Sequence, residues 1–484
     1  MFSALLQSLS PPQEMLRVLI GSLLASLPLP AAFAQPTNLP SANTYYVSSS
    51  VGNDQGDGRS PQSAWRTLAR VNAATLQPGD TILFQRDNLW RGQLRPKSGT
   101  ADRPVTYGAF GAGAKPILQS SVARDTSDDW VKGQNNLWAT RPSNSTLLDV
   151  DVGNIIFDDG QACGVKKWRR EDLRQNGDFW YDQTHQQVWL YADSPPTTQH
   201  HGLELALKRH IITEDGCHYV TYDDLHLRYG AAHGIGGGNT GNITVRRCDL
   251  CLIGGALQFT QAGGKPVRYG NGIEFWNAAR HNLVEQCRLW EIYDAALTDQ
   301  GIGADSEQVD ITYRNNVIWN AEYSFEYWNR PATARSENIL FEHNTCVDAG
   351  HGWAHQQRPD PNGQHLMSWA NLARTQGVVI RDNIFCNSAE TCMRMCNDWH
   401  AGLDLDHNLW FQQTGPLFDF LGRKFNPDQL AAYRTATGFD RHSVMAKPQF
   451  HNADQHDYRL AAGSPGLNWT ADRQPCGAII TGDE

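Results

Sequence analysis

Seven segments with one pattern recur along the chain, and this repeat restricts the possible folds more than any other feature. Each segment alternates apolar and polar residues and has a small or turn-forming residue at its sixth place. The segments begin at Tyr219, Ile243, Asn282, Ile311, Ile339, Val378 and Leu403, and their sixth residues are Asp224, Cys248, Cys287, Asn316, Asn344, Asn383 and Asn408. Units of about 25 residues with occasional insertions, and with no helical pattern between them, predict a solenoid of directly stacked parallel strands.

The sixth residues are expected to stack along the axis of this solenoid. Asn suits a bend because it tolerates left-handed dihedral angles, and stacked Asn side chains can hydrogen-bond from coil to coil. Cys248 and Cys287 share this position on adjacent coils, where they form either a disulfide or a packed thiol pair. The ten cysteines are not spaced as in a zinc module. We therefore expect buried small side chains with one or two disulfides.

A second strand follows most of the sixth residues. Its apolar anchor points into the coil, so the next residue points outward. This rule predicts one outward column at Gly236, Glu274, Thr298, Glu326, Ser368, Arg394 and Asp419, with Trp276, Gln300 and Trp328 next along the same face.

Acidic residues in and beside this column are the candidate catalytic groups, namely Glu274, Asp299 and Glu326, with Asp294 in reserve. Glu274 and Glu326 stand two coils apart, so about 9–10 Å separates their backbones, and Asp299 is expected about 5 Å from each on the coil between. Glycoside hydrolysis requires two carboxyl groups about 5 Å or about 6.5–9.5 Å apart. Crowding also raises the pKa of such groups, which makes one of them a usable acid. The alternative is a row of solvated or arginine-paired carboxylates.

Two insertions, residues 260–269 and 351–364, precede their strands and are expected to form walls beside this face. Aromatic side chains for sugar rings and basic groups for acidic substituents complete the candidate substrate-binding set, which is Trp276, Trp328, Arg330, His355, Trp369 and Arg394. Tyr327, His351 and Arg358 are further candidates. No metal site is expected, because the His-rich insertion lacks a helical i, i+4 pair.

The N-terminus carries the pattern of an export signal. An apolar run follows Arg17, and Ala32-Phe33-Ala34 fits an A-x-A cleavage site. We therefore expect a signal peptide over residues 1–34, from a start at Met1 or Met15, and a periplasmic or secreted protein. A membrane anchor is the alternative, but the run is short and prolines interrupt it.

The repeat, the opening Tyr45-Tyr46-Val47 and Gly52-Asn53-Asp54, and the closing Ala461-Ala462-Gly463-Ser464-Pro465 resemble the right-handed parallel β-helix of secreted polysaccharide-active enzymes, the pectate-lyase-like superfamily. The resemblance implies an all-β fold. An amphipathic helix is expected from Ala64 onward, with Trp65, Leu68 and Val71 on one face, and it would cap the first coil. A Trp-rich hairpin pattern over residues 179–191 resembles the small β-sandwich inserted in some β-helix glycosidases. The expected organisation is a cap and first coils over 43–120, an inserted lobe over 121–210, and the main β-helix with a C-terminal cap over 211–484.

These features favour a monomeric glycoside hydrolase that cleaves a polysaccharide or oligosaccharide by carboxyl acid–base chemistry without a cofactor. One alternative is a polysaccharide lyase, with a base among Lys265, Arg330, His355 and Arg394 and with Ca²⁺ held by Asp299, Asp305 and Glu307. The other is a non-catalytic carbohydrate-binding solenoid. The formal charge of −10 argues against nucleic acid as a partner. No segment of the mature chain is long and apolar enough to suggest a membrane span.

Overall fold

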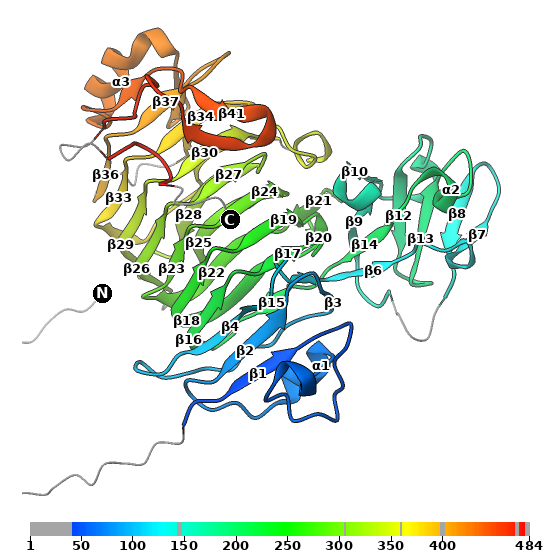
Figure 1. The fold of residues 1–484 in the computed structure, drawn as a ribbon. Coiled ribbons are helices and arrows are strands. Elements are labelled where there is room, and N and C mark those ends of the chain that lie inside the picture. Colours follow the sequence, from blue (N-terminus) through cyan, green and yellow to red (C-terminus); the bar gives the residue numbers. More distant parts are fainter. Residues whose placement is uncertain are drawn as a thin grey trace, which may run out of the picture. The chain divides into compact units, whose positions relative to one another are not determined.

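Strands of successive coils pair in parallel and lie one above the other, as the repeat predicts (Figure 1). The computed structural model describes residues 41–142, 148–303, 306–358, 361–396, 402–469 and 474–479, so the expected signal peptide lies outside the described residues. Residues Ala42–Glu484 form one compact unit. The chain is mostly β with few helices, and the parallel β-helix is confirmed.

Two long sheets run along the stack of coils. The first contains β1 Thr44–Val47, β2 Thr81–Gln85, β4 Val105–Phe110, β15 Ile212–Thr213, β16 His218–Asp223, β18 Ile235–Arg246, β22 Ile273–Arg280, β23 Leu283–Glu285, β25 Ala295–Gly301, β26 Glu307–Arg314, β28 Tyr323–Asn329, β29 Arg335–Glu342, β31 Gln364–Ser368, β32 Arg374–Gln376, β33 Val378–Arg381, β35 Met393–Met395, β36 Leu403–Asp406, β38 Phe418–Phe420 and β39 Arg423–Phe425. The second contains β3 Leu89–Arg91, β5 Ile117–Gln119, β17 His226–Arg228, β19 Asp249–Ile253, β24 Arg288–Ile292, β27 Val317–Trp319, β30 Thr345–Ala349, β34 Ile384–Ser388, β37 Leu409–Phe411 and β40 Val444–Met445.

The interior of the coils is filled by one continuous hydrophobic core. Aromatic rings stack from coil to coil within it: Phe325 on Phe341 with 4.7 Å between ring centroids, Phe341 on Phe385, and Phe385 on Trp410 at 4.4 Å. Each coil therefore buries its apolar face against the coils above and below it, which makes the rigid platform that carries the outward side chains.

The predicted ladder of sixth residues is confirmed for six of the seven positions. Strand register aligns Cys248 with Cys287 and then the four asparagines, whose side-chain carbonyls accept hydrogen bonds from the preceding coil. Asn316, for example, donates its backbone N–H to Oδ1 of Asn344 at 3.0 Å. The prediction for Asp224 is wrong, because Val220 pairs with Ile243 and this register puts Leu225 in the ladder.

The physical reason for the asparagines also differs from the expected one. The left-handed residue of each bend is the one before the ladder position, as at Asn315, His343 and Asp382. Asn344 itself donates Nδ2 to the Tyr313 carbonyl at 3.0 Å and to Oδ1 of Asn383 at 3.1 Å. The ladder residue is therefore Asn because a buried amide satisfies backbone groups on two coils.

Replacing Asn344 by Ala should destabilise the protein by about 3 kcal/mol, because the Asn316 backbone N–H and the Tyr313 carbonyl would lose partners in a buried site. Urea unfolding followed by circular dichroism would measure this loss. Asn452, exposed at the end of strand β41 (Phe450–Asn452), gives the matched control Asn452→Ala. Equal effects of the two substitutions would contradict a role of the ladder in stability.

Residues 121–207 contain two further sheets (Figure 1). One has β6 Ser121–Ala123, β9 Val152–Phe157, β10 Ala162–Cys163 and β14 Glu204–Leu207, and the other has β7 Trp130–Lys132, β8 Leu137–Thr140, β11 Val165–Lys166, β12 Asp178–Asp182 and β13 Gln187–Tyr191. Strands β12 and β13 pair antiparallel, so the predicted hairpin is confirmed. Both sheets contribute to one hydrophobic cluster that is separate from the core of the coils.

Helices are short in the described part of the chain: α1 Leu68–Ala73, α2 Pro196–Gln199 and α3 Leu430–Thr437. The helix expected near the N-terminus begins at Leu68, after Thr67, whose side chain accepts the Arg70 N–H. Trp65 is therefore not helical, although it is buried with Leu68 and Val71 in the core of the coils. Two hairpins complete the strands, β20 Ala256–Thr260 with β21 Pro266–Tyr269, and β41 with β42 Asp457–Leu460. Among the described helices, none has the length and apolar character that crossing a membrane requires.

All ten cysteines are free thiols. The expectation of one or two disulfides is therefore wrong. Cys248 and Cys287 form a packed pair in the ladder, and burial raises the pKa of the Cys287 thiol. Most of the other thiols also fill small spaces in the core, which is the role of a buried cysteine without a redox function.

Candidate active site

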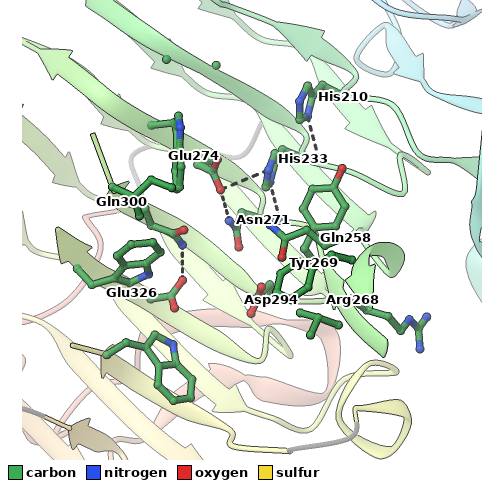
Figure 2. Close-up of a pocket in the computed structure, with 18 of the residues that line it drawn as sticks. His210, His233, Gln258, Arg268, Tyr269, Asn271, Glu274, Asp294, Gln300 and Glu326 are labelled. Carbon is green, nitrogen blue, oxygen red and sulfur yellow. Dashed lines mark hydrogen bonds and ion pairs between the residues drawn. The ribbon is translucent and has the colours of Figure 1, made fainter. Parts of the chain in front are cut away.

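A pocket of about 530 Å³ opens on the outward face of the middle coils (Figure 2). Its floor comes from strands β18, β22, β25 and β28, which present Glu274, Gln300 and Glu326. One wall is the hairpin β20–β21, with Gln258, Phe259, Val267, Arg268 and Tyr269, and Arg358 comes from the second predicted insertion. The structure thus places parts of both insertions beside the predicted column.

Strand register reproduces most of that column. Gly236, Glu274, Thr298 and Glu326 stand in line, and Trp276, Gln300 and Trp328 form the next line. The prediction for Ser368 is wrong by one residue, because Leu366 pairs with Phe325 and Met367 therefore follows Glu326. Arg394 and Asp419 continue the column beyond Met367.

Glu274 is held by two neutral hydrogen-bond donors. The Asn271 side-chain amide donates to Oε2 of Glu274 at 2.6 Å, and Nε2 of His233 lies 3.3 Å from the same oxygen. The Asn271 backbone N–H donates to Nδ1 of His233, so the imidazole proton is on Nε2. Burial lowers the pKa of His233 far below its ordinary value and keeps the ring neutral. Burial raises the pKa of Glu274 to about 8, against the Asn271 hydrogen bond. Glu274 therefore holds a proton at neutral pH.

Glu326 is also buried beside neutral groups. Nε2 of Gln300 donates to Oε2 of Glu326 at 2.5 Å, and Oγ1 of Thr298 lies 3.5 Å from it. Burial raises the pKa of Glu326 well above its ordinary value, and the nearby charge of Asp294 raises it further. Glu326 is therefore a second carboxyl group that holds a proton.

Asp294 is the pocket carboxylate with a cationic partner. It lies immediately before strand β25, and Nη1 of Arg358 is 3.1 Å from its Oδ1. The same guanidinium donates to the Tyr293 carbonyl at 2.8 Å and lies 3.5 Å from Glu322. Burial raises the pKa of Asp294, whereas Arg358 opposes that increase. Among Glu274, Asp294 and Glu326, Asp294 is therefore the one whose negative charge is best stabilised.

Asp299 does not line the pocket. Side chains alternate along β25, so Asp299 points to the opposite face from Thr298, into the coil. It is 1% exposed, and the Tyr313 hydroxyl donates to its Oδ1 at 2.6 Å. Asp299 therefore lies on the coil between Glu274 and Glu326, as predicted, but its side chain points away from them, and Asp294 is the carboxyl group that lines the pocket with them.

Four of the six predicted substrate-binding residues line the pocket: Trp276, Trp328, Arg330 and Trp369. The rings of Trp276 and Trp328 meet edge to face with centroids 5.9 Å apart, and the Arg330 guanidinium lies over the Trp328 ring. Phe259 adds a half-exposed ring from the hairpin wall. These surfaces suit the apolar faces of sugar rings.

His355 and Arg394 lie outside the pocket lining. His355 is bonded to Glu322, with 3.1 Å between Nδ1 and Oε2, and Arg394 donates to the Asn362 side chain at 2.8 Å. The suggested Ca²⁺ ligands do not converge either. Asp299 points into the core, Glu307 is paired with Arg335 at 3.0 Å, and Asp305 lies outside the described residues.

The sequence interpretation did not include His233 and Asn271. Both occupy the place two residues before the apolar anchor of their strands, Ile235 and Ile273, which pair directly. Asp294 stands three residues before the corresponding anchor, Leu297, and immediately before β25. A second set of polar residues just before the strands was therefore visible in the sequence, although only Asp294 was considered.

Comparisons with known proteins agree with this architecture. No protein-family model matches the chain. A curated lacto-N-biosidase from Bifidobacterium longum subsp. longum is 33% identical over 148 residues, which cover 27% of this chain and 9% of that protein. The chain therefore spans a small part of its curated relative.

Solved structures are similar in fold at low sequence identity. XylC, solved with xylose, has a TM-score of 0.50 and 11% identity over 78% of this chain and 69% of its own. Pectate lyase Pel9A has a TM-score of 0.48 and 11% identity over 91% and 97%. The chain thus has the parallel β-helix fold found in carbohydrate-active enzymes.

Proposed function

We propose that the protein is a glycoside hydrolase whose active site is the pocket of Glu274, Asp294 and Glu326. The observation that carries the proposal is the difference in surroundings of these carboxyl groups within one aromatic-walled pocket. Asp294 lies 3.1 Å from the Arg358 guanidinium, which favours its charged form, while Glu274 and Glu326 lie beside neutral donors and their pKa values are raised by burial. Two carboxyl groups poised in opposite protonation states are what hydrolysis of a glycosidic bond requires.

In this proposal Glu326 is the general acid and Asp294 the charged carboxylate. The charge of Asp294 raises the pKa of Glu326, and Arg358 stabilises the charge of Asp294, so we assign the proton of this pair to Glu326. Glu326 gives this proton to the glycosidic oxygen as the bond to the anomeric carbon breaks. Asp294 either attacks that carbon or takes a proton from the attacking water. Glu274, fixed by Asn271 and His233, binds a substrate hydroxyl.

The composition of the pocket also favours hydrolysis over β-elimination. No Lys lines the pocket among the described residues, and the Arg268 guanidinium is bonded to the Gly255 and Gly153 carbonyls. A uronate would have to enter beside the negative charges of Asp215 and Asp294, which both line the pocket, so we propose an uncharged sugar as substrate. The name of the curated relative, lacto-N-biosidase, supports an oligosaccharide substrate.

A panel of neutral and acidic oligosaccharides and polysaccharides tests the proposal. We expect new reducing ends from a neutral glycan, without the ultraviolet absorbance of an unsaturated uronate. That absorbance on a polyuronate would show a lyase instead. Saturable binding without cleavage across the panel would show a carbohydrate-binding solenoid.

A further inference from the structure

A ladder of alternating charge runs beside the asparagine ladder and ends at an unusual group. Register aligns Asp223, Arg246, Glu285, Arg314, Glu342, Arg381 and Asp406 on successive coils. Arginines pair with the preceding acid, as Arg314 does with Glu285 at 2.8 Å and Arg381 with Glu342 at 2.9 Å. Asp406 closes the ladder, and its partners are two histidines, His407 and His442.

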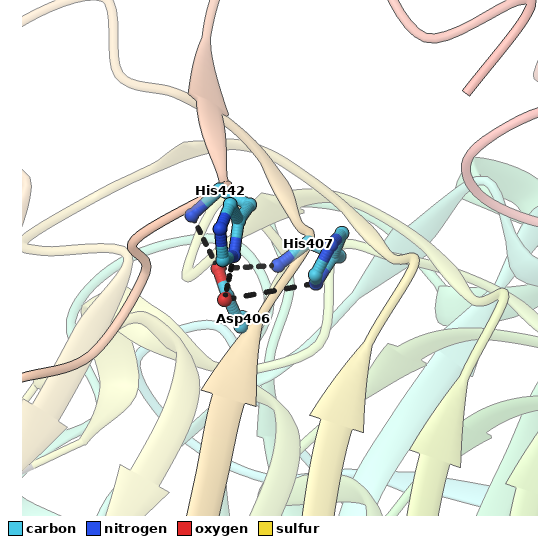
Figure 3. Close-up of side chains that lie close together, drawn as sticks. All are labelled: Asp406, His407 and His442. Atoms are coloured by element: carbon cyan, nitrogen blue, oxygen red, sulfur yellow. Dashed lines mark hydrogen bonds and ion pairs between the residues drawn. The ribbon is translucent and has the colours of Figure 1, made fainter. Parts of the chain in front are cut away.

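Both side-chain oxygens of Asp406 have partners on the two histidines (Figure 3). The backbone N–H groups of His407 and His442 donate to Oδ1 at 2.8 and 2.7 Å. Oδ2 faces the two imidazoles, with Nδ1 of His442 at 2.6 Å and Nδ1 of His407 at 3.6 Å. The two rings stack with centroids 4.8 Å apart. Two nitrogens and one carboxylate oxygen therefore converge, all within 4.8 Å of one another.

Buried hydrogen bonds hold the two segments that carry these side chains. Asp406 ends strand β36. On the other segment, Asp440 accepts from the Trp410 indole at 2.8 Å and from Ser443 at 2.5 Å. Ser443 in turn accepts the Asn408 backbone N–H at 2.9 Å. His442 lies between Asp440 and Ser443, so its backbone is fixed and only the exposed imidazole has to adjust.

We propose that Asp406, His407 and His442 bind a zinc ion. Two imidazole nitrogens and a carboxylate oxygen are a usual Zn²⁺ donor set, and water completes four ligands at such an open site. The ion would join the last coil, through β36, to the segment that follows α3. Its role would be to fasten the C-terminal end of the solenoid. The ligands are not recognisable as a motif because His442 comes 36 residues after Asp406.

Calorimetric titration of the full mature chain, without a histidine tag and after treatment with a chelator, tests the site with ZnCl₂. We expect one equivalent of Zn²⁺ to bind and the melting temperature to rise. His442→Ala and His407→Gln should each weaken this binding at least about 10-fold, as expected for loss of one ligand. Cobalt(II) in place of zinc should give the visible absorption of a four-coordinate ion.

His281→Ala is the matched control. His281 is exposed and lies 3.1 Å from Asp310, so it forms a similar His–Asp pair without a second imidazole. The His281→Ala variant should bind Zn²⁺ as the wild type does. Unfolding in the presence of chelator checks that each variant folds. The absence of stoichiometric binding, or equal binding by wild type and both ligand variants, would overturn the proposal and leave Asp406 as the hydrogen-bonded end of the charge ladder.

Discussion

Glu326→Gln should lower kcat/KM on a glycan that the wild-type protein cleaves by about 10²–10⁴-fold, the usual cost of losing a general acid. The oxygen of the new amide can still accept the hydrogen bond from Nε2 of Gln300, but the amide has no acidic proton to give to the glycosidic oxygen. Asp294→Asn should lower the rate at least as much, because the charge beside Arg358 is then lost. Initial rates from reducing-end release measure both effects.

The acidity of the leaving group distinguishes the role of Glu326 as general acid from that of Asp294 as the charged carboxylate. An aryl glycoside with a very acidic leaving group needs little protonation, so Glu326→Gln should recover much of its rate on such a substrate, whereas Asp294→Asn should not. Glu307→Gln is the control, since Glu307 is paired with Arg335 outside the pocket lining and should leave the rate unchanged. Folded variants of Glu274, Asp294 and Glu326 that all keep wild-type rates would refute the assignment.

The sequence predicts the parts of the site that follow from periodicity. The alternation of β22 and β28 is enough to place Glu274 and Glu326 in one outward column, because their anchors Ile273 and Phe325 belong to the same repeat. The same rule excludes Asp299, since the neighbour of an outward Thr298 has to point inward. Applied strictly, alternation would therefore have removed Asp299 from the catalytic candidates.

Other parts of the site depend on structure that no repeat encodes. Arg358 reaches Asp294 from an insertion 64 residues later in the chain. The hairpin wall bends back over the floor through the β20–β21 pairing. The error at Ser368 has a similar origin. The insertion over residues 351–364 hides the strand register, and Leu366 and Met367 are both apolar, so either could be taken as the inward anchor. A slip of one residue exchanges the two faces of a strand.

Asp299→Asn should make the protein more stable than the wild type, by an amount that grows as the pH rises from about 4 to about 7. Asp299 sits in the core, where Oδ1 accepts from Tyr313 and Oδ2 has no hydrogen-bond partner among the described residues. Burial raises the pKa of this carboxyl group from 3.8 to about 7. The folded state therefore prefers the neutral acid. The protonated Asp299 makes its full contribution to stability below the pKa of this group in the unfolded chain. That contribution is lost as the pH rises through the pKa of the group in the folded protein.

The size of the effect follows from the same numbers. At about 1.4 kcal/mol per pH unit, a rise from 3.8 to about 7 corresponds to at most about 4 kcal/mol. Urea unfolding at about pH 4, 5.5 and 7.5 should show that the free energies of unfolding of the wild type and Asp299→Asn diverge by an amount of this order. Asp404→Asn, at an exposed position on β36, is the matched control and should stay parallel to the wild type. If the difference between wild type and Asp299→Asn does not change with pH, Asp299 is already charged in the folded protein, and the core must hold that charge through groups other than Tyr313.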